Sequence, residues 1–258
     1  MATLAETAPQ TARSDERFFL IMALTMMALV FTAFSVNLAM GRSTFARPLL
    51  VHAHAVVFMG WIVIYVLQNL LVSRGSMALH RALGWIGAGW IALMIVLGTM
   101  VAVASIQQGG VPFFFTPLGF LVFDSVMLLT FAGLTWAAIA LRRRTDWHRR
   151  LHYCGMAVLM GPAFGRLLPL PLLMPWAYEA AILPTLIFPV IGMIADRRRT
   201  GAVHPAWFWG LAVMIASVLL TEAITYSPVG DAIYRAVAAG TPGAAIAPLD
   251  YPPPPAMP

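Results

Sequence analysis

Two long apolar runs joined by a short basic turn most strongly constrain what this chain can fold into. They read LLVHAHAVVFMGWIVIYVLQNLLV (residues 49–72) and ALGWIGAGWIALMIVLGTMVAVASI (residues 82–106). An α-helix rises about 1.5 Å per residue, so about 24 apolar residues cover the roughly 30 Å hydrocarbon core of a bilayer. The stretch therefore predicts a transmembrane helical hairpin.

The composition extends this interpretation to the whole chain. Of its 258 residues, 60% are hydrophobic and 10% are charged, whereas soluble domains carry about 25% charged residues. We therefore expect a polytopic membrane protein. An all-α fold follows, because an open sheet edge cannot be satisfied in lipid and no alternating barrel pattern is present. The single cysteine, Cys154, excludes an intrachain disulfide.

The apolar runs predict seven transmembrane helices in one bundle. The expected spans are Phe18–Ala39, Leu49–Val72, Ala82–Ile106, Phe113–Leu141, Leu151–Leu173, Trp176–Ala195 and Pro205–Tyr226. Prolines predict a break near the outer end of the fifth span. Residues 1–17 are expected to form a cytoplasmic leader and residues 18–226 the bundle. Residues 227–258 are expected to form an outer tail rich in Ala, Gly and Pro, extended or disordered apart from an amphipathic turn near Asp231–Ala238.

The arginines predict the orientation of the bundle. All sixteen basic residues are Arg, and twelve fall on the side of the N-terminus, whereas three fall on the other side. An excess of basic residues marks cytoplasmic loops, so we expect the N-terminus in the cytoplasm and the C-terminus in the periplasm of a bacterial inner membrane. The basic residues suit an anionic lipid leaflet. We do not expect the chain to bind nucleic acid.

Three histidines near the inner ends of predicted helices form the first candidate site. His148 and His152 are four residues apart and therefore share one helix face, and His80 opens the third span. A b-type haem needs two axial ligands from facing helices. His80 with His148 or His152 could supply them, and Arg81 or Arg149 could hold the propionates. The alternative is that histidine beside arginine at a membrane edge is only interfacial.

The outer half of the bundle holds a second candidate group. From helix rise, the predicted depths bring Arg166, Glu179 and Glu222 into this half, with Asp124 below them near the midplane. An unpaired charge in lipid costs roughly 2.5–3.5 kcal/mol. We therefore expect Arg166 to form an ion pair with at least one of the three carboxylates. Such a pair could be an interhelical lock, or it could line a polar cavity open to the periplasm.

His52 and His54 open the second span and form a candidate metal pair. Neutral imidazole is a common ligand for copper, zinc and haem iron. Two positions on a helix are about 200° apart, so both rings can face one ion only if the helix start unwinds. The alternative places one ring in the bundle and the other at the headgroups.

Short motifs carry a resemblance to known proteins. The His-Ala-His helix start, the segment LHRALGW (residues 79–85) and the basic-His segment at residues 147–152 resemble an uncharacterised family of bacterial predicted multi-pass membrane proteins. The segment VHAHAVVFMGW more distantly resembles helix starts in haem- and copper-containing membrane proteins of the nitric-oxide response, and in haem–copper oxidases. The resemblance implies contact with a metal or haem.

These observations lead to three functional hypotheses. The first is an inner-membrane protein that binds haem b or copper and acts in electron transfer, or in the assembly of a respiratory or photosynthetic complex. The second is a cofactor-free transporter or receptor with an outer polar cavity. The third is a structural subunit of a larger membrane complex. No nucleotide loop, HExxH or GxSxG motif is present, so the sequence assigns no catalytic residue.

Overall fold

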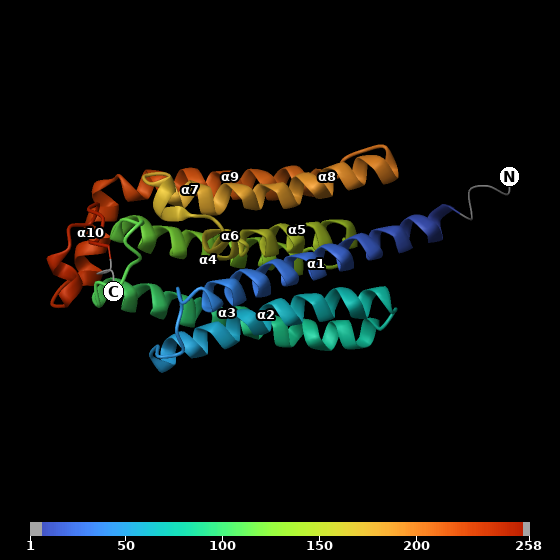
Figure 1. Cartoon of the computed structure of the whole chain (residues 1–258). Helices are drawn as coiled ribbons and strands as arrows, with labels where there is room; N and C mark the ends of the chain where they lie inside the picture. The colour runs from blue at the N-terminus through green and yellow to red at the C-terminus, as the bar shows by residue number, and fades with distance from the viewer. Residues whose placement is uncertain (1–6, 255–258) are drawn as a thin grey trace.

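The computed structural model is a bundle of long, roughly antiparallel helices (Figure 1). It describes residues 7–254, with side chains from residue 15 onward, and no strand occurs in this range. The helices are α1 (Thr7–Ala39), α2 (Leu49–Ser73), α3 (Met77–Gln107), α4 (Pro117–Ala140), α5 (Thr145–Val158), α6 (Gly161–Leu167), η1 (Leu170–Leu173), α7 (Ala177–Ile182), η2 (Leu183–Leu186), α8 (Ile187–Thr200), α9 (Pro205–Thr225), α10 (Pro228–Ala238) and η3 (Pro242–Ala245).

Six helical segments in the described range are long and apolar enough to cross a membrane. They are Asp15–Ala39, Leu49–Ser73, Met77–Gln107, Pro117–Ala140, Ala177–Thr200 and Pro205–Thr225. The chain is therefore a multi-pass, all-helical membrane protein. The first described turns of α1 and the helix α10 lie at opposite ends of the bundle (Figure 1). We call these the N-terminal end and the α10 end.

The fifth predicted span is two helices. α5 ends at Val158, and α6 begins at Gly161 with Pro162 in its first turn. Proline has no N–H to donate to the carbonyl one turn back, so the helix breaks there, as the sequence predicted. The sixth span is also interrupted, because η2 separates α7 from α8 at Pro184. Freed backbone groups at such breaks need partners within the protein.

Helix α4 lies at the centre of the bundle. It packs against α3, α5, α9 and α10, and the Phe131 side chain on it is completely buried. The outer faces of the bundle carry large exposed apolar side chains, among them Trp85, Trp136 and Leu219. In water such a surface would be unfavourable, but in a bilayer it faces hydrocarbon.

Both ends of the chain are more ordered than the sequence predicted. Within the expected leader, α1 is already helical from Thr7, and residues 1–6 lie outside the described range. The expected extended tail instead folds back onto the α10 end, where the Tyr234 side chain is buried and its hydroxyl donates to the Gly243 carbonyl at 3.0 Å. The Leu118 N–H donates to the Pro248 carbonyl at 2.9 Å. These contacts reach as far as Pro248, and residues 255–258 lie outside the described range.

The contact between α8 and α9 gives a prediction for stability. A Cβ atom added at Gly192 would lie 2.2 Å from the buried Trp207 ring, and overpacking of this kind typically costs about 1–3 kcal/mol. Gly192→Ala should lower the thermal unfolding midpoint in detergent. Gly89→Ala in α3 is the control, because its Cβ would meet nothing within 4 Å. Equal midpoints for the two variants would contradict this packing.

Candidate functional site

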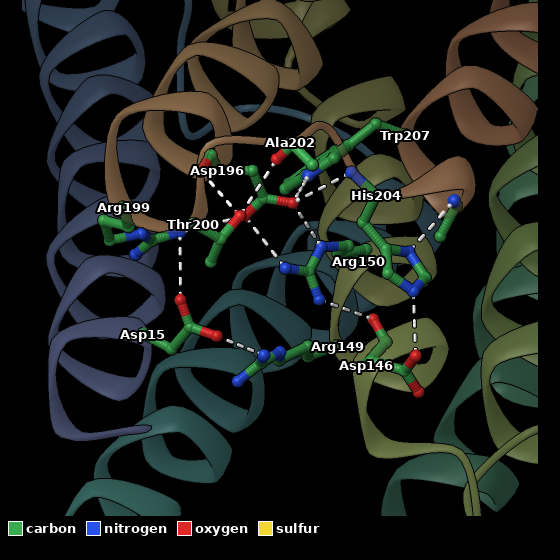
Figure 2. A network of polar contacts seen from close by, with 11 residues as sticks. Asp15, Asp146, Arg149, Arg150, Asp196, Arg199, Thr200, Ala202, His204 and Trp207 are labelled. Atoms are coloured by element: carbon green, nitrogen blue, oxygen red, sulfur yellow. Dashed lines mark hydrogen bonds and ion pairs between the residues drawn. The ribbon is translucent and has the colours of Figure 1, made fainter. Parts of the chain in front are cut away.

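A buried carboxylate organises the N-terminal end of the bundle. Asp196 of α8 accepts hydrogen bonds from both Nε and Nη2 of Arg150 on α5, each at 2.8 Å, and from the Trp207 indole on α9 at 2.7 Å (Figure 2). The Asp196 and Arg150 residues are only 1% and 4% exposed. Because both charges are saturated by close partners, this pair is a well-formed interhelical lock.

The lock extends to α1 through a second carboxylate. Asp15 forms ion pairs with Arg149 of α5 and, at 3.1 Å, with Arg199 of α8. Arg199 also reaches Asp196 at 3.0 Å. Figure 2 shows these side chains converging from three helices onto one layer. Arg149 is one of the two arginines predicted as candidates to hold a haem propionate, but in the structure its guanidinium forms an ion pair with Asp15.

A histidine cap completes this layer at the start of α9. The His204 Nδ1 accepts from the Ala206 N–H at 3.1 Å, which leaves Nε2–H to donate to the Asp146 carboxylate at 2.8 Å. Burial favours the neutral form of Asp146, but the hydrogen bond and charge of His204, together with hydrogen bonds from the Trp147 and Asp146 backbone, outweigh it, so the Asp146 pKa lies below its ordinary value. His204 therefore fixes the α9 start relative to the α5 start.

Sequence reasoning missed the three aspartates of this layer. Asp15, Asp146 and Asp196 each lie within a few residues of arginines at a predicted inner membrane edge. That context is typical of a solvated, topogenic segment, so the pattern alone favoured an exposed role. The available signal was that each aspartate borders a span and has arginines on other helices at the same predicted depth.

The three inner histidines do come together beside this layer. The ring centroids of His80 on α3 and His148 on α5 lie 6.3 Å apart, and those of His148 and His152 lie 4.8 Å apart. The His148 Nδ1 lies 2.7 Å from the Ala138 carbonyl of α4. A carbonyl can only accept, so Nδ1 carries the proton and Nε2 keeps a free lone pair.

Unpaired polar atoms surround this histidine cluster. The His80 Nδ1 and the Gln68 Oε1 are buried without a hydrogen-bond partner among the described residues. His80 lies against the backbone of Gln68. Arg81 acts electrostatically on His80, and Arg142 acts on His148. Buried polar atoms are normally satisfied, so these orphans mark a place where a partner fits.

The structure does not present a ready-made site for a bare metal ion. Within the described residues, no group of three or more His, Cys, Asp or Glu side chains is arranged to hold one. The predicted pair His52 and His54 is also separated. The His52 Nε2 lies 3.0 Å from the Phe45 carbonyl in the preceding loop, whereas the His54 ring stacks on Phe58 with centroids 4.1 Å apart.

The structure does not close the predicted ion pair of Arg166. In the described range Arg166 forms no ion pair with Asp124, Glu179 or Glu222. Its guanidinium lies over the Phe34 ring at 3.9 Å, and its Nη1 donates to the Pro162 carbonyl at 2.9 Å. Helix rise estimates the depth of a residue along a helix axis but not the direction of its side chain around that axis.

The outer charges also form two groups instead of one. Asp124 and His54 interact electrostatically with Arg166. Glu222 interacts instead with Glu179, and Glu179 lines an open groove with mainly apolar neighbours from η1, α7 and η2. The expected single polar cavity is therefore replaced by a half-buried cluster of three ionisable residues and a separate pair of glutamates.

No family model, curated protein or solved structure matches this chain.

The Asp196 lock gives a second stability prediction. Asp196→Ala leaves Arg150 as an uncompensated buried charge, and breaking such a pair typically costs about 3–5 kcal/mol. The variant should lose most of its thermal stability in detergent. Asp231→Ala is the control, because its ion pair with Arg235 on α10 is exposed and should leave the midpoint unchanged. Similar midpoints for both variants would show that the buried pair is not a lock.

Proposed function

We propose that this chain is a membrane protein that binds a b-type haem through His80 and His148 and takes part in electron transfer. The observation that carries the proposal is the ring separation of 6.3 Å. Two imidazoles on opposite sides of one iron have centroids about 6 Å apart, because each metal–nitrogen bond is about 2 Å and each nitrogen lies roughly 1 Å from its ring centre.

The surroundings of the pair suit an axial ligand role. The His148 Nδ1–H donates to the Ala138 carbonyl, which is the second interaction that orients most metal-bound imidazoles and leaves Nε2 for the iron. Haem requires only two protein ligands, so the lack of a three-residue metal group among the described residues favours haem over a bare copper ion. Arg81 and Arg142 are the candidates to hold the propionates.

The proposal predicts a specific absorbance spectrum. Protein purified from haem-supplemented cells should show a Soret band with the α and β bands of a six-coordinate b haem. His80→Ala and His148→Ala should each reduce the bound haem at least tenfold. His52→Ala is the control and should keep the spectrum, since its ring lies against the Phe45 carbonyl in the loop between α1 and α2, away from α5. A wild-type protein without a Soret band would reject the haem hypothesis.

We further propose seven crossings, with the seventh made by α5 from Leu151 through α6. α6 contacts α1 and α7, and its start continues the path of α5 after a break of two residues. With this crossing, the twelve arginines at the N-terminal end lie in the cytoplasm of a bacterial inner membrane, and the α10 end lies in the periplasm.

Cysteine labelling tests this topology. Cys154 is completely buried, so the wild-type background should be low. Gly201→Cys, between α8 and α9, should be protected from a membrane-impermeant maleimide in intact cells and should react after permeabilisation. Gly240→Cys, after α10, should react in intact cells. Both are glycines with open space around the added Cβ. Labelling of Gly201→Cys in intact cells, with Gly240→Cys protected, would contradict seven crossings from a cytoplasmic N-terminus.

A further inference from the structure

Prolines shape an open groove toward the α10 end of the bundle. Three of them, at positions 169, 171 and 175, prevent the chain after α6 from continuing as one helix. Residues of η1, α7 and η2 instead line a groove of about 680 Å³, and α7 lies toward the α10 end (Figure 1). A volume in this range is typical of sites for small ligands.

A small apolar cluster holds the groove in shape. Leu173 and Ala180 line the groove. Both also pack against the buried side chains of Leu170, Ala177 and Ala181. Because packed side chains change position little, this part of the lining is already formed before a ligand arrives.

The rest of the lining is apolar and lies at one edge of the membrane. Leu172, Trp176 and Leu183 line the groove and are 82%, 66% and 48% exposed. Trp176 comes directly before the membrane-spanning segment Ala177–Thr200, at the depth where tryptophan usually meets the lipid headgroups. The acyl chains of the bilayer are therefore the apolar molecules that reach these side chains.

Glu179 is the one ionisable residue that lines the groove. It lies about 3 Å from the start of the spanning segment by helix rise, and it forms no ion pair in the described part of the chain. Arg235 at the same end pairs instead with Asp231. A carboxylate beside apolar side chains at a membrane edge is unfavourable without a cation. An occupant with a positive group would therefore complement the groove.

We infer that this groove binds a phospholipid with an ammonium headgroup, of the phosphatidylethanolamine class. The acyl chains lie along Leu172 and Leu183, the ammonium donates to the Glu179 carboxylate, and the phosphate stays toward the water. An anionic lipid without an ammonium, such as phosphatidylglycerol, would instead bring a like charge to Glu179. The site is separate from the histidine cluster and does not depend on whether that cluster binds haem.

Native mass spectrometry of the purified, delipidated full-length protein tests this site. The two probes are phosphatidylethanolamine and phosphatidylglycerol with the same dioleoyl chains. Wild type should bind its first phosphatidylethanolamine about fivefold more tightly than phosphatidylglycerol, because an ion pair near the membrane edge adds a modest amount to the shared acyl contacts. Glu179→Gln keeps the size of the side chain but removes its charge, so it should bind the two lipids equally. Leu183→Trp narrows the groove and should weaken the binding of both.

Asp231→Asn is the matched control, because it removes an exposed carboxylate of the same end outside the groove and should keep the preference of wild type. Equal affinities of wild type for the two lipids would overturn the inference, and so would a preference that survives Glu179→Gln. Unchanged affinities in Leu183→Trp would place the lipid outside the groove and would also overturn it. If Leu183→Trp does not fold, Glu179→Gln decides the question alone.

Discussion

The rest of the structure depends on how a charge is accommodated in a bundle that is otherwise apolar. Asp196 accepts from Arg150, Arg199 and Trp207, so three side chains from three helices determine where its carboxylate lies. A buried charge without such partners would cost several kcal/mol. Saturation of this carboxylate therefore fixes the start of α5 relative to α8 and α9.

The fixed start of α5 determines what the histidine cluster can do. His148 and His152 lie two residues before and two residues after Arg150 on the same helix, so the position of Arg150 sets which way their common face points. His148 is further held by the Ala138 carbonyl of α4. Two rigid contacts therefore set the distance between the His80 and His148 rings: the ion pairs around Asp196 and the packing of α4 against α5. Neither depends on a flexible surface residue. Ligand sites of this precision need such support.

Sequence reasoning predicted the helices well because a single quantity, apolar length against bilayer thickness, decides them. It also placed His148 and His152 on one face, since a spacing of four residues fixes relative direction within a helix. Between helices, depth can be estimated but direction cannot. For this reason the sequence did not predict the contact of Arg166 with Phe34, and the Asp196 lock was missed. The sequence did not predict the folded tail, because a segment rich in Ala, Gly and Pro gives no signal for the contacts that Tyr234 makes.

The break between α5 and α6 connects these observations. A continuous helix would tie the direction of Arg166 to that of His152, because each residue turns about 100° relative to the one before. Because the helix breaks at Pro162, the direction of side chains on α6 is independent of that on α5. Arg166 on α6 therefore packs against the Phe34 ring of α1. The Pro162 carbonyl then accepts from Arg166. The same proline therefore separates the two polar regions of the bundle and supplies the contact that orients the outer one.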